Sequence, residues 1–503
     1  MTLTDIAKDG RKEGAHRPFP RVTVTNEAWR SAVQELVDAR ATLLGLWGDE
    51  GCVHMALIEE PSANIVVLTL PCPDGKFPSV GLSHPPAIRL ERAILSLYGL
   101  KPVGALDTRP WLDLGFWGIT QPLGAKKKSR KAQEAYAFLP VEGEDLHQIP
   151  VGPVHAGIIE PGHFRFTANG EAVARLEERL GYVHKGIESL MTGASIDKGA
   201  QLAGRTSGDS TVAYAFAYAR AVEAALQVEV PESAVYPRAL MAELERLANH
   251  FGDIGAICND ASFSILLADF AILRERVLRT ADACFGHRLM MDRIVPGGVV
   301  QDIALDGLAQ IPVLIETVRR KFPELVEVYD NTASLQDRTV TTGYLSPTLA
   351  RAFGAGGYVG RASGRAFDMR KAARYPPYDT LEFEVPVRDD GDVNARVWIR
   401  IREVEQSLRL IEQIVTRLPS GPTRVELPDV GEVREGLGLV EAFRGDVLVW
   451  LRLGPDGRIE RCHLRDASWF QWPLLEACVE GNIVADFPLC NKSFNCSYSG
   501  HDL

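Results

Sequence analysis

The feature that most constrains the fold of this chain is a set of long helical patterns in its second half. Between residues 237 and 256 the apolar side chains follow one face of a helix: Leu240, Leu244, Leu247, Phe251 and Ile254. Similar stripes occur in residues 211–226, 266–277 and 397–418, and a further helix is expected to begin near Asp306. Because such helices bury their apolar faces against one another, the sequence predicts a bundle of long helices.

Length and composition limit the class of protein. The chain has 503 residues, more than a single hydrophobic core usually serves, so two or three domains are expected. The hydrophobic share of 46% and the charged share of 24% are ordinary for a soluble protein, and no uninterrupted apolar run is long enough to cross a bilayer. The net charge of −11 argues against a nucleic-acid ligand, and the eight cysteines, none in a CxxC pair, are expected to be free thiols.

These patterns divide the chain into segments. Residues 1–19 are expected to be an N-terminal tail, and residues 20–113 a small α+β domain that docks partners, because it shows no catalytic or metal-ligand constellation. Residues 114–148 have the composition of a linker, with a solvated basic run at 126–131. Residues 149–503 carry the long helices. The predicted fold class is α+β: a small N-terminal α+β domain followed by a long-helix-bundle domain with small peripheral sheets.

The second domain begins with a Gly- and Pro-rich pattern. Residues 149–166 predict a β-hairpin with a long tip, which could carry His155 into a cavity as a ligand or proton-transfer group, or hold it as a structural side chain. Helices are expected at residues 171–179 and 182–191. Strands are expected at residues 41–47, 52–58, 64–70, 382–385 and within 441–462.

The loop of residues 204–210 precedes the helix at 211–226. Its Ser-Gly-Asp-Ser sequence is typical of an N-cap, in which hydroxyl and carboxylate oxygens accept from free N–H groups. The helix dipole would favour the Asp209 carboxylate there, and Tyr214 lies one turn beyond Ser210 on the same face.

Two charged segments leave alternatives open. Glu243, Arg246 and His250 line a second face of the helix at 237–256, which predicts a solvated or salt-bridged surface. Residues 361–371 have no apolar period, so their charges either face solvent or close over a polar cavity.

The ordered motifs resemble a known superfamily over nearly the whole chain. The sequence contains GPVHAGIIEPGHFRF, GYVHKGIESL, AYARAVEAALQVEVP, ELERLANH, GRASGRAFDMRK, GDVNARVWIRIREVEQSLRLIEQ and EAFRGD. These strings are similar to the large subunit of energy-converting nickel–iron hydrogenases of the formate-hydrogenlyase kind, and to the quinone-site subunit of respiratory complex I. In the N-terminal part, ERAILSLYGL followed by DTRPWLD resembles a second, smaller complex I subunit, to which such hydrogenase subunits are fused.

The resemblance also implies where nickel ligands would lie. The family carries two cysteine pairs, and the matching positions in this chain are Ser207, Ser210, Ser497 and Gly500. Cys490 and Cys496 lie nearby, but neither has a CxxC partner. Because thiolates hold and tune such a centre, the resemblance implies a vacated cofactor loop, including Arg205, with no nickel–iron centre and no other metal.

The quinone chemistry of the complex I relatives is matched only in part. His155 aligns with a family histidine, but the second loop histidine falls near Pro161 and the quinone-binding tyrosine near Ile196. We therefore expect His155, Asp209 and Tyr214 to converge on one cavity with the C-terminal tail, in an arrangement suited to proton-coupled reduction of an organic acceptor. The alternative is a hydrogen-bonded polar plug in the place of the cluster.

The resemblance implies a subunit of a membrane-associated, energy-converting oxidoreductase complex of the NADH dehydrogenase and hydrogenase kind. The expected role is electron relay from an adjacent iron–sulfur subunit, which would hold a 4Fe-4S cluster, to a quinone-like or other acceptor. The expected partners are that small subunit, a ferredoxin-like subunit and antiporter-like membrane subunits, with a cytoplasmic, peripheral location on the inner face of the cytoplasmic membrane. A non-catalytic structural subunit is the alternative, and an active nickel–iron hydrogenase is the interpretation that the ligand positions favour least.

Overall fold

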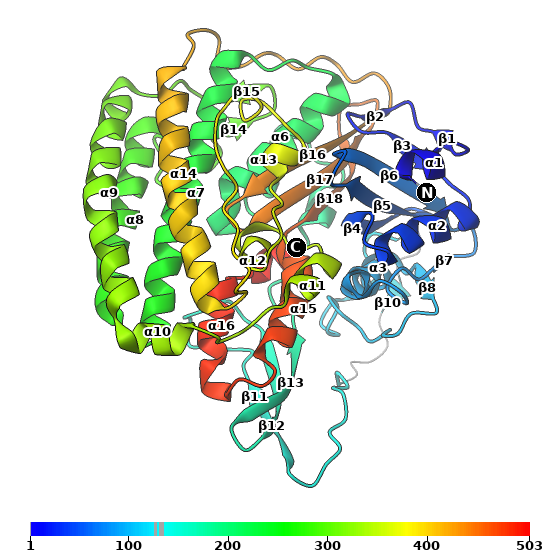
Figure 1. Ribbon diagram of the computed structural model, residues 1–503. Coiled ribbons are helices and arrows are strands. Elements are labelled where there is room, and N and C mark those ends of the chain that lie inside the picture. The colour runs from blue at the N-terminus through cyan, green and yellow to red at the C-terminus, as the bar shows by residue number, and fades with distance from the viewer. Residues whose placement is uncertain (1, 125–127, 130–134) are drawn as a thin grey trace.

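The computed structural model describes residues 2–124, 128–129 and 135–503, so most of the basic run at 126–131 lies outside the described residues. The architecture is α+β, as the sequence predicts. Figure 1 shows the long helices on one side, a small sheet beside helix α6 in the centre, and the N-terminal sheet unit on the other side. The three parts pack into one body with a continuous buried core.

The long helices stand side by side at the left of Figure 1. They are α7 (Glu232–Asp260), α8 (Ser264–Phe285), α9 (Leu305–Asn331) and α14 (Val393–Thr416). Leu240, Phe251 and Phe270 from the expected apolar faces are fully buried between them. Helix α8 ends at Gly286 in the left-handed conformation (φ 69°), the conformation in which glycine carries no Cβ penalty. The predicted helix bundle is therefore confirmed.

The N-terminal unit has a sheet in the order β1-β3-β6-β5-β4. Its strands are β1 (Arg11–Lys12), β3 (Arg21–Thr23), β4 (Thr42–Asp49), β5 (Cys52–Glu59) and β6 (Asn64–Pro71). Helices α1 (Leu3–Ala7), α2 (Asn26–Val37) and α3 (Ile88–Tyr98) accompany it, the last after the 3-10 turn η1 (Pro85–Ala87). The strands expected at 41–47, 52–58 and 64–70 are confirmed within one or two residues.

The central sheet has the order β18-β17-β16-β2. It consists of β2 (His16–Arg17), β16 (Arg434–Ala442), β17 (Gly445–Leu453) and β18 (Ile459–Arg465). Helix α6 (Thr211–Leu226) packs closely on β16, because a Cβ at Gly436 or Gly438 would lie 1.8 or 2.0 Å from a backbone oxygen of the helix. In the N-terminal tail expected at residues 1–19, β2 pairs with β16 and the side chains of Leu3 and Ile6 are buried, so residues 2–19 pack on the folded body.

Three expectations of secondary structure are wrong. Residues 171–179 form strand β13 (Ala172–Arg179), not a helix, because β12 (His163–Asn169) pairs with them and this pairing overrides their helix propensity. Only α4 (Ile187–Met191) is helical within 182–191, and residues 382–385 run without a strand partner. The expected hairpin itself is confirmed, since β11 (Leu146–Val151) pairs antiparallel with β12.

Shorter elements complete the described chain. They are β7 (Lys76–Pro78), β8 (Lys101–Val103), β9 (Ile119–Thr120), β10 (Lys128–Ser129), α5 (Ile196–Ala203), η2 (Gly208–Ser210), β14 (Ile294–Val295), β15 (Gly298–Val299), α10 (Ala333–Thr339), α11 (Pro347–Ala352), α12 (Gly357–Ala362), α13 (Met369–Ala372), α15 (Ser468–Val479), η3 (Val484–Asp486), α16 (Phe487–Phe494) and α17 (Tyr498–Asp502). None of the described helices combines the length and the apolar character needed to span a bilayer.

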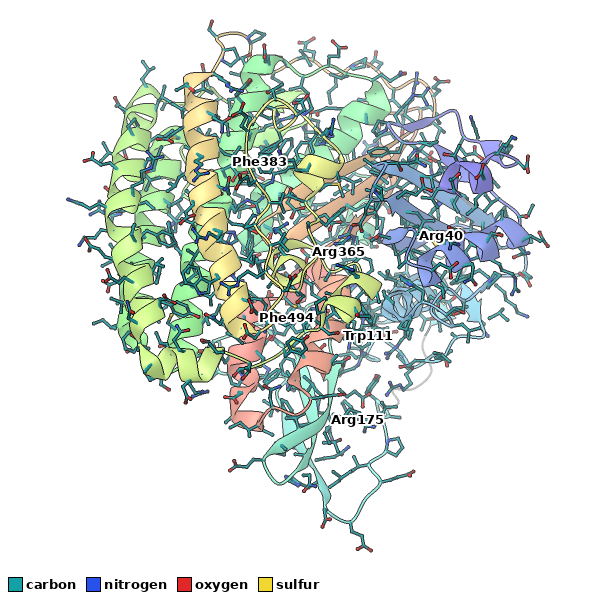
Figure 2. The ribbon with its side chains drawn as sticks, in the orientation of Figure 1. Arg40, Trp111, Arg175, Arg365, Phe383 and Phe494 are labelled. Carbon is teal, nitrogen blue, oxygen red and sulfur yellow. The ribbon has the colours of Figure 1, made fainter. Side chains whose placement is uncertain are left out.

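Polar contacts join the N-terminal unit to the second domain across a buried seam. Arg452 of β17 donates to Asp49 of β4 at 2.5 Å, and the Trp111 indole donates to His501 Nε2 at 3.2 Å. Trp111 is 1% exposed and lies in the interior between the two parts (Figure 2). We propose a division into a docking domain at 20–113, a linker at 114–148 and a catalytic-type domain at 149–503. The two domains share a buried core, because these contacts join them.

Candidate functional site

The loop of residues 204–210 after α5, here called the serine loop, meets the C-terminal segment of residues 495–503. The Ser207 and Ser497 hydroxyl oxygens are 2.8 Å apart, although 290 residues separate them in sequence. Ser497 also caps α17, accepting from the Gly500 backbone N–H at 2.8 Å. Ser210 lies on the other side of Asp209 and donates to its carboxylate at 3.2 Å. The four positions that the resemblance assigned to nickel ligands are therefore brought to one place.

Asp209 forms the charged centre of this place. Its carboxylate accepts from Arg444 Nη2 at 2.6 Å and from the Ser207 hydroxyl at 2.7 Å. Desolvation raises the pKa of Asp209, but the Arg444 charge and the hydroxyl donors outweigh it and lower the pKa below its ordinary value. Asp209 is therefore an ionised acceptor and a poor proton donor at neutral pH.

The expected N-cap of α6 by its own loop is wrong. The helix has no side-chain cap from Ser210, and Asp209 is turned to Arg444 instead. The cap comes from Glu245 of α7, whose carboxylate accepts from Val212 N at 2.7 Å and Ala213 N at 3.1 Å. A carboxylate from a neighbouring helix satisfies the same free N–H groups, so the loop side chains are released for other contacts.

The Glu245 cap predicts a pH effect on stability. Burial raises the pKa of Glu245 from 4.5 to about 8, partly offset by the two N–H donors. Because its pKa is raised on folding, Glu245 holds its proton more tightly in the folded protein than in the unfolded chain. The stabilisation that results is fully present below pH 4.5 and is lost as the pH rises toward 8. In Glu245→Gln, which mimics the protonated side chain, this loss is absent. We expect the unfolding free energy of the wild type to fall relative to the variant between pH 5 and about 8. Urea titrations measure it, and a constant difference over that range would contradict it.

Tyr214 lies behind the charged centre rather than at a surface. It is fully buried, and its hydroxyl donates to Asp466 Oδ2 at 2.9 Å. Burial, with the Asp466 charge, raises the Tyr214 pKa well above its ordinary value. Gly500 leaves room for this contact, because a Cβ there would lie 2.7 Å from Asp466 Oδ2. The phenol therefore positions Asp466 beside the C-terminal segment.

His155 and Arg205 lie apart from this cluster. The His155 Nε2 atom is 2.7 Å from the Gly162 carbonyl oxygen, and its ring lies 5.6 Å from the Phe164 ring, so both contacts stay within the hairpin. Arg205 forms a bidentate pair with Asp292 at 2.5 and 2.7 Å, with its side chain 40% exposed. Two of the three expected catalytic residues therefore lie at the C-terminal segment. Asp209 reaches it through Ser207, and Tyr214 through Asp466.

A cavity of about 340 Å³ opens beside Asp209. The hairpin tip, the serine loop and the C-terminal segment line it with residues 158–160, 207–209, 444, 492 and 495–499. Its charged side chains are Glu160, Asp209, Arg444 and Lys492. Sequence reasoning missed Arg444 and Lys492 as site residues. EAFRGD contains Arg444 and was noted only as a family motif, whereas no pattern marks Lys492 on α16.

Two buried arginines and a buried tyrosine hold the C-terminal segment in position. Arg400 donates to the Ser493 carbonyl at 2.8 Å, Tyr358 to the Phe494 carbonyl at 2.8 Å and Arg444 to the Asn495 carbonyl at 2.5 Å. Asn495 turns the chain in the left-handed conformation (φ 46°), and its amide donates to Asp253 at 2.9 Å. Hydrogen bonds to three successive carbonyls, two of them charge-assisted, fix the segment that carries Ser497.

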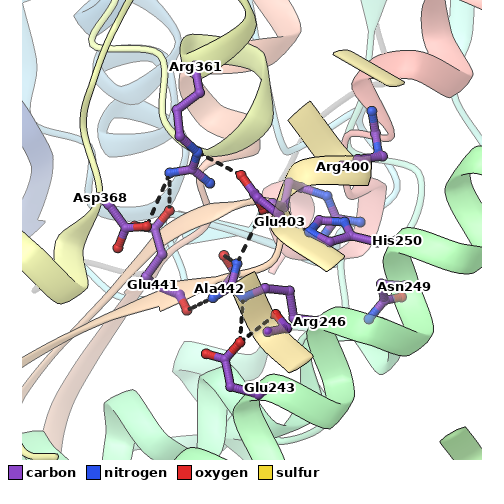
Figure 3. A network of polar contacts seen from close by, with 12 residues as sticks. Glu243, Arg246, Asn249, His250, Arg361, Asp368, Arg400, Glu403, Glu441 and Ala442 are labelled. Carbon is purple, nitrogen blue, oxygen red and sulfur yellow. Dashed lines mark hydrogen bonds and ion pairs between the residues drawn. The ribbon is translucent and has the colours of Figure 1, made fainter. Parts of the chain in front are cut away.

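A buried network of charges supports the site from the side of the bundle (Figure 3). Arg361 donates to Glu403 at 2.7 Å and to Glu441 at 2.9 Å, and His250 Nε2 is 2.8 Å from Glu403. Glu243 is bound by Arg370 at 3.0 Å. All of these side chains are at most 4% exposed. The salt-bridged alternative for the face of α7 is thus confirmed and the solvated one is wrong, because residues 361–371 fold over this face.

The network has opposite effects on its carboxylates. Burial raises the pKa of Glu403, but Arg361, His250 and Arg246 outweigh it and hold that pKa well below its ordinary value. Burial and the nearby Asp368 charge raise the pKa of Glu441 to about 7. Glu441 lies one residue before the end of β16, and the turn after this strand carries Arg444, so the turn links the network to the cavity.

The residues at the vacated positions do not fit a thiolate-bound nickel–iron centre. They offer hydroxyl oxygens that already bond to one another, to Asp209 and to the Gly500 N–H. Cys496 is buried and faces Gln471, while burial raises the pKa of the Cys496 thiol well above its ordinary value. The donor set is hard and neutral where such a centre needs thiolates.

One group of possible metal ligands lies elsewhere in the described chain, at the seam. Asp49, Cys52 and His54 have ligand atoms within 4.8 Å of one another. The Asp49 carboxylate is already bound by Arg452 at 2.5 Å and approached by Arg461 at 3.5 Å. Two guanidinium groups already neutralise the Asp49 carboxylate, so we interpret this cluster as part of the contact between the N-terminal unit and the second domain.

This architecture, with its serine loop and C-terminal segment, defines a large subunit of the hydrogenase and complex I type. A family described as the respiratory-chain NADH dehydrogenase 49 kDa subunit matches residues 261–436. Formate hydrogenlyase subunit 5 of Escherichia coli (strain K12) is 33% identical over 437 residues, 85% of this chain and 77% of that protein. The chain therefore belongs to the family of hydrogenase large subunits and complex I 49 kDa subunits, which confirms the resemblance seen in its motifs.

Two further relatives extend the comparison. An NADH-quinone oxidoreductase subunit of Desulfotalea psychrophila is 33% identical over 349 residues, 68% of this chain and 93% of that protein. A solved structure of the membrane-bound sulfane sulfur reductase, an archaeal respiratory membrane complex, matches with a TM-score of 0.68 and 27% identity over 73% of this chain and all of that one. The relatives are thus subunits of hydrogenase-like and complex I-like membrane complexes.

Proposed function

We propose that this chain is the large subunit of a membrane-associated oxidoreductase complex and that it reduces an organic acceptor at the cavity beside Asp209. The observation that carries the proposal is the cavity of about 340 Å³, which Arg444 and Lys492 line together with the hydrogen-bonded pair of Ser207 and Ser497. The acceptor is a quinone or a compound of similar redox chemistry. Electrons come from an iron–sulfur cluster of an adjacent subunit.

The side chains of the cavity suit the charge changes of this reaction. Reduction of a quinone to a quinol takes two electrons and two protons, and negative charge develops on its oxygens as electrons arrive. Arg444, held in place by Asp209 at 2.6 Å, would stabilise that charge without reorganisation. Lys492 has no ion-pair partner among the described residues, so its ammonium group is available to approach the same oxygen and deliver a proton.

A non-catalytic role has its own supporting observation. Ser207, Ser497 and the Gly500 N–H form a closed set of hydrogen bonds, and Ser468 donates into Asp466 beside them at 2.6 Å. Such a polar plug would keep the loop and the C-terminal segment together in a structural subunit. Acceptor reduction by the intact complex separates the roles, because a plug supports assembly without turnover. The test is quinone titration of the purified complex under reducing conditions, and a complex that assembles without reducing any quinone or related acceptor would contradict the catalytic proposal.

The proposal includes the absence of a nickel–iron centre. We expect elemental analysis of the purified complex to find less than about one tenth of a nickel atom per chain, because hydroxyl oxygens bind such a centre far less well than thiolates. The same preparation should not reduce dyes with hydrogen. Stoichiometric nickel together with hydrogen-dependent dye reduction would contradict the prediction.

The proposed partners follow from the family. They are a small iron–sulfur subunit with a 4Fe-4S cluster, a ferredoxin-like subunit and antiporter-like membrane subunits, which would place this chain peripherally on the inner face of the cytoplasmic membrane. Mass spectrometry of proteins that copurify with the tagged chain tests this set of partners.

A further inference from the structure

A second cleft, of about 610 Å³, lies on the seam between the N-terminal unit and the second domain. The turn between α2 and β4, the β5–β6 turn and His84 line one side; residues 351–354 and 364–366 line the other. Figure 2 labels Arg40 on the first side and Arg365 on the second. The volume is in the range of sites for small molecules.

The back of the cleft is held rigidly by an ion pair between the two parts. Arg365 is 4% exposed, donates to the Ala355 carbonyl at 2.8 Å, and reaches Glu60 at 2.5 Å. Thr42 donates to the same Glu60 oxygen at 2.5 Å. The seam is also tight, because a Cβ at Gly354 would lie 2.9 Å from the Thr42 side chain. The cleft is therefore preformed.

His84 is the unpaired polar group of this cleft. It is 7% exposed and lines the cleft, yet its ring nitrogens have no hydrogen-bond partner among the described residues. Burial lowers the pKa of His84 to about 4, so the neutral ring offers one donor and one acceptor at neutral pH. No group in the described part of the chain satisfies these nitrogens, and they are not sealed from the cleft, so a ligand bound there can form hydrogen bonds with them.

The other lining residues define the chemistry of that ligand. Arg351 is exposed at the rim and has no ion-pair partner in the described part of the chain, whereas Arg40 is held by Glu35 at 2.6 Å. Apolar side chains form the rest of the wall: Leu36, Leu43, Pro61 and Phe353. The cleft thus combines one unpaired cation, one unpaired imidazole and an apolar surface.

We propose that this cleft binds a small organic anion with an apolar body. Its carboxylate or phosphate group contacts Arg351 and His84, and its body packs against Leu36, Leu43 and Phe353. This site is separate from the cavity beside Asp209 and does not depend on the redox proposal.

Calorimetric titration of the full chain tests the proposal with octanoate, octyl phosphate, octanol and inorganic phosphate. We expect at least one of the two amphipathic anions to bind 10-fold or more tightly than octanol and inorganic phosphate, and the preferred anion tells carboxylate from phosphate. Arg351→Gln should weaken that binding about 10-fold and leave octanol unchanged. His84→Phe, which keeps a ring of similar size but removes both nitrogens, should also weaken it about 10-fold.

Arg320→Gln on α9 is the matched control, because it removes an exposed arginine far from the cleft in sequence. Arg351 is exposed, so its variant keeps the test valid if His84→Phe fails to fold. Failure of both amphipathic anions to outbind octanol, or wild-type affinity in Arg351→Gln, would overturn the proposal. Loss of quinone reduction in the Asp209 cavity would leave this result unaffected.

Discussion

Replacing Arg361 with methionine is expected to lower the free energy of unfolding by about 3–5 kcal/mol. The Arg361 guanidinium is 1% exposed and donates to Glu403 and Glu441 at 2.7 and 2.9 Å. Its removal leaves these carboxylates with too little positive charge in a dry interior, and an unpaired buried charge costs far more than the pair itself contributes. Denaturant unfolding of the purified chain measures the change.

The matched control is Arg319→Met on α9. Arg319 also binds a glutamate in bidentate fashion, Glu412 at 2.7 and 2.6 Å, but the two side chains are 51% and 40% exposed. Its loss should cost no more than about 1 kcal/mol, because water solvates the released charges. Adding Glu441→Gln to Arg361→Met should recover part of the loss, since it removes one uncompensated charge. Equal losses of unfolding free energy in Arg361→Met and Arg319→Met would contradict the prediction that the buried charge is the more costly one to remove.

The second large effect is expected at Lys492. Lys492→Met should slow acceptor reduction by the assembled complex by about 10²-fold, the lower end of the usual cost of removing a proton donor from the reacting group. Lys492 lines the cavity on α16 and forms no ion pair among the described residues. Its charge acts at longer range on half-buried Asp260, where it partly offsets the rise in pKa that burial causes. Steady-state reduction of a soluble quinone, driven from the complex's own electron donor, measures the effect.

Lys321→Met on α9 serves as the control, because within the described part of the chain that lysine pairs only with exposed Glu324, at 2.9 Å. Both variants should assemble with the same partners, as judged by copurification. Unchanged turnover in Lys492→Met, with a complex that reduces quinone in the wild type, would remove Lys492 from the mechanism and leave Arg444 as the cation of the cavity.

Much of the fold could be predicted because its signals are local. The apolar period of α7, the glycine that ends α8 and the Gly- and Pro-rich hairpin each lie within one short stretch. The helix expected at 171–179 was wrong for the opposite reason. Its residues suit a helix, but pairing with β12 makes them a strand, and that partner is chosen by the tertiary fold.

The sequence by itself determined the family, the helix bundle and the loss of thiolates at positions 207, 210, 497 and 500, since each follows from residue identity and order. Only the tertiary structure decided what those positions do. It turned Asp209 from a helix cap into the partner of Arg444, buried Tyr214 against Asp466 and kept His155 within its hairpin. The first two outcomes depend on contacts between residues 235 and 252 positions apart, and the third on a hydrogen bond that competes with any contact to the distant loops. Hydrogen bonds and ion pairs act over a few ångströms in space, and no local pattern records which distant groups the packed core brings within that range.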